Sequence, residues 1–468
     1  MKRSKRILIL LGIFIVACTA TFGVMQYEER KEQIKNSDEI ILELAGDSVQ
    51  SLSWSYEGDT LAFHRDEKWL YDEDETFPVD EKKIGELLEQ FQAFGVSFII
   101  EEVEDYEQYG LDDPTCTINL TTEEQSYEIL LGDYSKMDSQ RYVSIGDGNV
   151  YLVKSDPMDY YDRTLSDMID HDETPSFENA TAIQFEGTEN YKVTYEEDSN
   201  STYCKDDVYF TQQDGKNMPL DTSRVNSYLS HISSLDLTDY VTYNATDSEL
   251  ESYGLDVPEL TVMIDYTEEE ESGEKTANAF ILHIGLNKEE KEAAEQTAED
   301  DDNLGEAITA YVRVGESQIV YQISSTDYDD LIAASYDSLR HLEVLSADFE
   351  DIYQVDISLE GVDYTIAAEE NEDERVWYYQ EEQLEIGDFR RALMNINASS
   401  FTGENQTQQE EISLTIYLDN ENYPTVQIVL YRYDGASCLA VVDGEPVSFV
   451  SRSDVVDLIE AVHAIVLN

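Results

Sequence analysis

The side chains best suited to metal chemistry are thinly spread along this chain. Zinc sites and metalloprotease sites use histidines at short, regular spacings, such as HExxH. No two histidines lie at such a spacing, and HExxH is missing. The six are His64, His171, His231, His283, His341 and His463. His283 lies in an alternating apolar run, where we expect it to occupy a strand face rather than bind a metal.

Carboxylate pairs such as Asp112-Asp113 or Asp72 and Asp74 could act as general acid and base. With 103 acidic residues, however, such pairs arise by chance throughout the chain. The calcium-loop pattern D-x-[DN]-x-[DN]-G, the GxSxG elbow, the phosphate-binding loop and the dinucleotide fingerprint are all missing. The sequence therefore predicts no catalytic residue, no metal ligand and no cofactor, and a protein that is not an enzyme.

One short motif, Y-G-L-D-x-P, occurs at 109–114 and again at 253–258. Its mixture of Tyr, Asp, Gly and Pro resembles a binding loop. Gly also permits a tight turn, Pro ends regular structure, and Tyr with Leu can close the edge of a small core. Its occurrence at the same place in two copies of a repeat favours a structural role.

Cysteine usage does not indicate a disulfide framework. Cys116, Cys204 and Cys438 share no CxxC spacing, and an odd number cannot all pair. Cys116 and Cys438 lie in or beside strand-like runs, so we expect buried free thiols there. Cys18 lies in the apolar N-terminal segment.

A repeated element must position all these residues. Tyr56-Glu57-Gly58, Phe185-Glu186-Gly187 and Leu359-Glu360-Gly361 each lie between two alternating apolar runs. This arrangement predicts a β-hairpin with Glu-Gly at or beside the turn, because Gly tolerates positive φ. Three occurrences indicate one structural unit used three times.

The first predicted repeat covers 39–175 and the second 176–345. In each, an Asp precedes a helix with apolar residues at i, i+3, i+4 and i+7. These faces are Ile84, Leu87, Leu88 and Phe91 in the first copy and Val225, Tyr228, Leu229 and Ile232 in the second. The second copy also carries an acidic insertion, 288–306, which we interpret as a solvated loop.

The third predicted repeat, 346–468, is degenerate and lacks Y-G-L-D-x-P. Its helix face is Phe389, Ala392, Leu393 and Ile396, and a closing amphipathic helix presents Val455, Leu458, Ile459 and Val462. Terminal repeats often deviate because they cap an array. The predicted fold class is α+β: three tandem repeats of antiparallel β-hairpins with one main helix each, preceded by a single transmembrane helix.

The N-terminus indicates export. Four basic residues lie within 1–6, and Ile7 to Met25 follows without a charge, close to the roughly 20 residues that cross a bilayer. We therefore predict a cytoplasmic tail at 1–6, an anchor at 7–26, a linker at 27–38 and an extracytoplasmic remainder. A lipoprotein signal ending at Cys18 and a cleaved signal peptide are the alternatives, and the apolar stretch after Cys18 disfavours the first.

The exported part is strongly acidic. No acidic residue precedes Glu28, so 103 acids face the 25 bases that follow the basic tail, a net charge of −78. Such a surface repels nucleic acid and anionic lipid. A chain with 32 Tyr, 15 Phe and only 8 Pro can nonetheless bury several cores, so we expect a folded protein.

Several segments together resemble the bacterial family called domain of unknown function 4340. They are 54–58, 68–71, 77–80, 109–114 and 141–143, and the second copy resembles the family more weakly. The resemblance implies a membrane-anchored exported protein, in some members associated with gliding-motility-type or other auxiliary ABC transport components. It assigns no catalytic residue.

The sequence thus favours a single-pass, extracytoplasmic scaffold or binding protein, accessory to an ABC-type membrane complex. Two alternatives stay open. One is a carbohydrate or peptide binder that uses exposed aromatic residues such as Tyr71 or Tyr378. The other is an envelope hydrolase with two carboxylates in a cleft between repeats.

Overall fold

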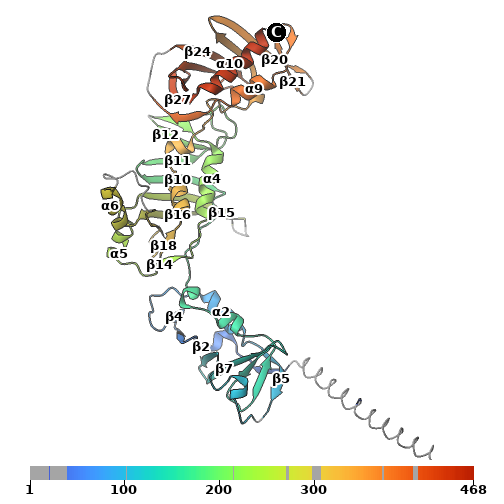
Figure 1. Cartoon of the computed structure of the whole chain (residues 1–468), viewed down its shortest axis with the longest axis vertical. Helices are drawn as coiled ribbons and strands as arrows, with labels where there is room; N and C mark the ends of the chain where they lie inside the picture. Colours follow the sequence, from blue (N-terminus) through green and yellow to red (C-terminus); the bar gives the residue numbers. More distant parts are fainter. Residues whose placement is uncertain are drawn as a thin grey trace, which may run out of the picture. The chain divides into compact units, whose positions relative to one another are not determined.

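The computed structural model describes Thr21 and residues 39–467, apart from 102, 214, 270–272, 298–306, 372–373 and 404–408. The chain divides into two compact units, 1–171 and 172–468. The first contains one β-sheet and the second contains two (Figure 1). The two later predicted repeats therefore form one compact unit, while the repeat boundaries at 175 and 345 stay predictions.

The first unit is built on a nine-stranded antiparallel sheet in the order β1-β5-β9-β8-β7-β6-β2-β3-β4. Its strands are β1 Glu39–Leu42, β2 Val49–Tyr56, β3 Asp59–Arg65, β4 Trp69–Tyr71, β5 Phe94–Ile100, β6 Cys116–Thr122, β7 Ser126–Ser135, β8 Gln140–Ser144 and β9 Val150–Val153. Helices α2 Glu81–Glu89 and α3 Met158–Tyr161 contact each other, and Tyr161 Oη donates to Leu87 O at 3.0 Å.

The second sheet has the order β13-β12-β11-β10-β15-β16-β17-β18-β14. Its strands are β10 Ala180–Gly187, β11 Tyr191–Tyr195, β12 Tyr209–Gln213, β13 Lys216–Pro219, β14 Tyr240–Thr242, β15 Leu260–Glu269, β16 Lys275–Leu286, β17 Ala310–Val314 and β18 Val320–Ile323. The helices are α4 Thr222–Ser233, α5 Asp247–Ser252, α6 Lys288–Thr297, α7 Ser325–Ile332 and α8 Tyr336–Leu339.

The third sheet has the order β22-β21-β20-β19-β24-β25-β26-β27-β23. Its strands are β19 Ile352–Leu359, β20 Val362–Asn371, β21 Glu374–Tyr379, β22 Glu382–Gln383, β23 Ala398–Phe401, β24 Glu410–Leu418, β25 Thr425–Arg432, β26 Ser437–Val442 and β27 Glu445–Ser451. Helices α9 Gly387–Met394 and α10 Arg452–Val466 pack together over it (Figure 1).

Eight strands follow the same order in all three sheets. Reading from β5, β14 or β23, each sheet continues through equivalent strands to β4, β12 or β21. The predicted α+β class with antiparallel sheets and repeated use of one unit is therefore confirmed. The prediction of one main helix per unit is too simple, because α2 contacts α3, α4 contacts α7 and α8, and α9 contacts α10.

The Glu-Gly hairpin is confirmed in all three copies, with Glu-Gly at the turn in the first and third copies and beside the turn in the second. Glu57 and Gly58 have φ of 53° and 96°, and Glu360 and Gly361 have 53° and 79°, as a two-residue type I′ turn requires. Gly187 instead ends strand β10 and pairs with Leu260. Glycine is required at position 187 for a different reason, because a Cβ there would lie 2.6 Å from the Glu259 carbonyl oxygen.

The predicted helix starts and apolar faces are confirmed. Asp80 Oδ1 accepts from the N–H groups of Lys82 (2.8 Å) and Lys83 (3.3 Å), and Asp221 repeats this geometry at α4. In α9 the N-cap is Ile386, with no side-chain hydrogen bond. All four predicted positions of α4 are buried, as are Ile84, Leu87 and Leu88 of α2 and Phe91 just after it. Phe389 and Leu393 of α9 and Ile396 just after it are buried, while Ala392 is half-buried. In α10, Val455, Leu458 and Val462 are buried and Ile459 is half-buried.

Replacing Asp80 by alanine is expected to lower the free energy of unfolding of the first unit by about 1 kcal/mol, because two helix N–H groups lose their acceptor. Urea unfolding followed by fluorescence of Trp54 and Trp69, in a Trp377→Phe background, measures this. Asp80→Asn keeps the acceptor and should unfold at about the wild-type midpoint. An equal loss of unfolding free energy in Asp80→Ala and Asp80→Asn would mean that the charge of Asp80 stabilises the unit, and it would contradict a role for Asp80 as a helix cap.

Two other sequence expectations are corrected. The acidic insertion is not wholly a loop, because 288–297 forms α6, whose first turn is capped by Asn287 Oδ1 accepting from the N–H groups of Glu289 and Glu290. Tyr71 is buried against Phe63 and Phe77 and is not an exposed binding aromatic.

The predicted anchor at 7–26 lies outside the described residues except for Thr21. Within the described part, no helix combines the length and apolar character needed to cross a membrane.

Candidate functional site

The densest group of potential ligand side chains lies in the second unit, around His341. His341 belongs to the segment 340–348, which follows α8 and leads to the third sheet; we call it the connector. The connector runs alongside the third sheet, since Val344 N donates to Ile396 O (3.0 Å) and Ala398 N donates to Leu342 O (2.7 Å). It also forms an isolated antiparallel bridge between Glu343 and Asn397.

The other half of the group comes from the second sheet, in the loop 196–208 between β11 and β12. We call this segment the docking loop. In the first copy, the equivalent strands β3 and β4 are joined by only three residues, 66–68. The second copy therefore carries ten additional residues at this position.

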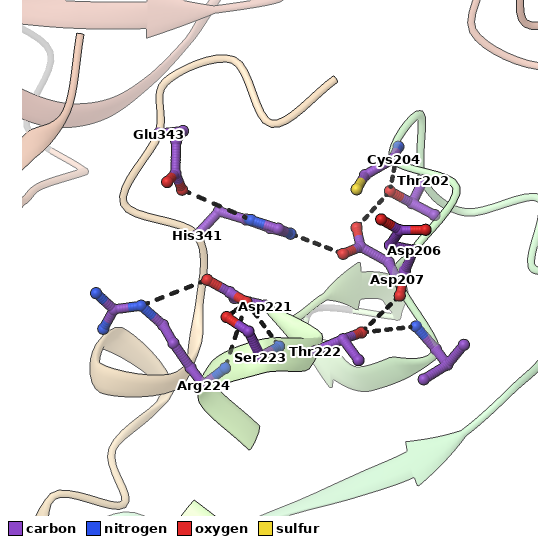
Figure 2. A network of polar contacts seen from close by, with 11 residues as sticks. Thr202, Cys204, Asp206, Asp207, Asp221, Thr222, Ser223, Arg224, His341 and Glu343 are labelled. Carbon is purple, nitrogen blue, oxygen red and sulfur yellow. Dashed lines mark hydrogen bonds and ion pairs between the residues drawn. The ribbon is translucent and has the colours of Figure 1, made fainter. Parts of the chain in front are cut away.

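His341 joins the connector to the docking loop (Figure 2). Its Nε2 lies 2.8 Å from Asp207 Oδ1, and its Nδ1 lies 3.8 Å from Glu343 Oε2. The Asp207 side chain is only 1% exposed, and Thr202 Oγ1 donates to its Oδ2 at 2.7 Å. A buried carboxylate is thus satisfied by one hydroxyl and one imidazole from opposite sides.

This arrangement changes the ionisation of His341 and Glu343. Burial lowers the pKa of His341, but the interactions with Asp207 and Glu343 outweigh it and raise the pKa to about 9. The contact with His341 lowers the pKa of Glu343 to about 2. The cluster therefore holds an imidazolium between two carboxylates at neutral pH. Such a histidine cannot act as a general base, and Glu343 cannot act as a general acid.

Asp221 lies next to this cluster but is already occupied (Figure 2). Its Oδ1 caps α4 by accepting from the N–H groups of Ser223 and Arg224, and its Oδ2 lies 3.5 Å from Arg224 Nε. Arg224 in turn donates to Ser338 O at 3.0 Å. Asp221 therefore fixes the start of the helix beside the connector.

Further contacts tie the docking loop to the third sheet. Lys205 Nζ lies 2.5 Å from Asp351 Oδ1, and Asn422 Nδ2 donates to Asn200 Oδ1 at 2.8 Å. Tyr203 packs against the hydrophobic core of the third sheet and meets Tyr423 edge-on, with ring centroids 5.9 Å apart. We call the docking loop, the connector and these partners the joint.

A cavity of about 560 Å³ opens beside the joint. It is lined by tyrosines from both sides (Tyr203, Tyr336 and Tyr423), by Lys216 and by Arg340. The guanidinium of Arg340 lies over the rings of Phe401 (4.1 Å) and Tyr336 (4.9 Å). The aromatic and polar lining of this cavity suits a polar ligand with flat faces.

The carboxylates considered from the sequence lie in turns and loops of the first unit. Asp72 Oδ1 lies 2.7 Å from His64 Nδ1, while Asp74 Oδ1 accepts from the Thr76 N–H (2.9 Å). Asp112 and Asp113 are exposed in the turn that precedes β6. Asp72 and Asp74 therefore each have a local structural partner.

His283 lies on strand β16, as predicted. Its Nδ1 lies 3.0 Å from Thr261 Oγ1 on the paired strand, and burial lowers its pKa. Cys116 and Cys438 are buried free thiols, as predicted, and Cys204 is a half-buried free thiol. Burial raises the pKa of Cys204 to about 12.

The Y-G-L-D-x-P motif is explained by packing. Gly110 and Gly254 both have φ of 67°, and Leu111 and Leu255 are buried. The turn places its backbone against a glycine of the neighbouring strand. A Cβ on Gly132 would lie 2.2 Å from Tyr109 O, and a Cβ on Gly285 would lie 2.5 Å from Gly254 O. The motif tyrosines pack on Tyr142 and Tyr311 of equivalent strands.

The joint was missed from the sequence because His341 and Asp207 are 134 residues apart and neither belongs to a recognised motif. One signal was present. When the copies are aligned, the segment between the strand pairs is much longer in the second copy, and this added segment contains Thr202, Cys204 and Asp207. An insertion specific to one copy indicates a contact that only this copy makes.

A comparison with curated proteins gives no match. A family model described as "Domain of unknown function (DUF4340)" matches residues 69–258 and, in an overlapping second match, 211–415. The two matches start in the equivalent strands β4 and β12, and they end just before β15 and within its equivalent, β24. Together they cover well over half of the 468 residues, so the chain belongs to the family of domain of unknown function DUF4340.

Proposed function

We propose that this protein is a non-enzymatic scaffold or binding protein on the outer side of a cell membrane, held there by its N-terminal segment. The joint is the observation that carries the proposal. A histidine and two carboxylates that could serve catalysis are instead used to connect two sheets, with the imidazolium neutralised on both sides. Building a stiff connection between repeats suits a protein that holds partners at fixed positions.

The partner we propose is an ABC-type membrane complex, of the gliding-motility-like or a related class. The resemblance of the repeat motifs to exported accessory proteins motivates this choice. The basic tail followed by an uncharged apolar run supports an anchored, exported chain. The net charge of −78 beyond the tail disfavours nucleic acid as a partner.

Affinity purification of the tagged full-length protein from cross-linked membranes tests this proposal. We expect transporter subunits to co-purify. The matched control carries residues 1–38 fused to an unrelated soluble domain, so that membrane location is kept and the repeats are lost. Recovery of no transporter or envelope component, or equal recovery with the control, would contradict the proposal.

A second candidate function, binding of an envelope carbohydrate or peptide, is favoured by the cavity at the joint. Three tyrosines and a stacked arginine line it. Titration with envelope glycan fragments and peptides should then show saturable binding that Tyr336→Ala weakens. For the hydrolase alternative, the contact with His341 lowers the pKa of Glu343 to about 2, so this carboxylate of the cavity could serve only as the ionised member of an acid–base pair.

A further inference from the structure

The geometry points to a zinc site at the joint, formed by Cys204, Asp207 and His341. One ligand atom from each side chain lies within 4.8 Å of the other two. A thiolate, an imidazole and a carboxylate form a ligand set that Zn²⁺ prefers among divalent cations. The first two ligands come from the docking loop and the third from the connector, so the metal would join the two sheets.

The orientation of His341 supports this assignment. Glu343 faces Nδ1 at 3.8 Å, which leaves Nε2 directed towards Asp207 and Cys204 (Figure 2). Zinc-bound histidines commonly have a carboxylate on the nitrogen that does not bind the metal, because it fixes the tautomer and the ring orientation. Glu343 occupies that position as a positioning residue.

The docking loop is held in place by a second set of contacts. Thr202 Oγ1 donates to Asp207 Oδ2 at 2.7 Å and accepts from Cys204 N–H at 3.0 Å. Asp207 N–H donates to Cys204 O at 3.4 Å, which closes a turn between the two ligands. These contacts leave Asp207 Oδ1 and the Cys204 thiol available on the side that faces His341.

Two further features decide the form of the site. The present 2.8 Å separation between His341 Nε2 and Asp207 Oδ1 is a hydrogen bond. Zinc would displace the Nε2 proton of His341 and the thiol proton of Cys204 to solvent, and it would replace the hydrogen bond with two bonds of about 2.0–2.2 Å. His341 also lines the cavity, so that a water molecule can reach the fourth coordination position. The neighbouring Asp221 is engaged by α4 and Arg224 and is left out of the ligand set.

Cobalt titration of the full-length protein tests the site. Excess Mg²⁺ is included so that the acidic surface does not bind Co²⁺ diffusely. We expect one equivalent of Co²⁺ to bind, with a thiolate-to-cobalt charge-transfer band and the visible absorption of a tetrahedral site, and Zn²⁺ to displace it. Cys204→Ser should abolish the charge-transfer band. Glu343→Gln should keep the band and weaken binding by about tenfold or more.

Cys438→Ser is the matched control, because it removes another free thiol of the same compact unit and should leave binding unchanged. Cys204 is only half-buried, so its serine variant should fold, which circular dichroism checks. The proposal is overturned if the wild type binds no stoichiometric cobalt, or if Cys204→Ser binds as the wild type does. The first result would mean that His341 and Asp207 form an ion pair only, and the second would mean that the bound cobalt is not held by Cys204.

Discussion

Replacing His341 by alanine is expected to lower the free energy of unfolding of the unit 172–468 by about 3–5 kcal/mol. The Asp207 side chain, which is 1% exposed with His341 in place, would then keep Thr202 as its hydrogen-bond donor but lose its compensating charge. Leaving a buried charge without its partner costs far more than losing a surface ion pair. The measurement is urea unfolding with chelator present, followed by Trp377 fluorescence in a Trp54→Phe/Trp69→Phe background.

His231→Ala is the control in the same unit. His231 Nδ1 lies 3.3 Å from Asp330 Oδ2, but both side chains are nearly half exposed, so we expect a loss below about 1 kcal/mol. A double variant, Asp207→Ala/His341→Ala, removes both charges and should recover part of the stability lost in His341→Ala. If His341→Ala and His231→Ala were equally mild, the joint would not depend on the buried ion pair.

The second large effect is expected at Gly132, where replacement by alanine should lower the free energy of unfolding by about 3 kcal/mol. The new Cβ would lie 2.2 Å from the Tyr109 carbonyl oxygen and 3.0 Å from the Leu111 side chain. The first neighbour is backbone in a tight turn, so relief requires the whole Y-G-L-D-x-P turn to move away from β7. Trp54 and Trp69 fluorescence in the Trp377→Phe background reports the unfolding.

Gly85→Ala provides a control with the opposite sign. Gly85 lies inside α2 with open space where a Cβ would lie, so alanine should stabilise the first unit by about 0.5–1 kcal/mol. Gly285→Ala should reproduce the Gly132 effect in the other unit, because its Cβ would meet Gly254 O at 2.5 Å. A neutral Gly132→Ala variant would show that the motif is not held by this close backbone contact.

Local features of the fold could be predicted from the sequence. The Asp80 and Asp221 caps, the helix faces that follow them and the hairpins at Glu57 and Glu360 depend on residues within a few positions of one another. Their repetition made each assignment firmer, because an error in one copy would rarely recur in the next. In the second copy Glu186 and Gly187 lie beside the turn rather than in it, because the connection from β10 to β11 is longer and Gly187 pairs with Leu260.

The joint depends on partners far apart in the chain, and this is why it was not predicted. His341 attracted no prediction of a site because no other histidine lies at a ligand spacing from it. Its partners are instead one carboxylate two residues away and another 134 residues away. The contact between these residues depends on how the second and third sheets lie against each other, and the periodicity of apolar residues along the chain does not encode that arrangement. The longer β11–β12 connection nevertheless marks one of the segments involved.

The most direct test of the joint is hydrogen exchange of the full-length protein, comparing wild type, His341→Ala and His231→Ala. The central claim is that the buried ion pair between His341 and Asp207 holds the docking loop against the connector, which runs along the third sheet. We therefore predict that His341→Ala speeds exchange together in three segments, 196–208, 340–345 and 396–401, with the first sheet unchanged. His231→Ala should leave all three as in the wild type. Faster exchange confined to the residues next to 341, or no change at all, would contradict the claim.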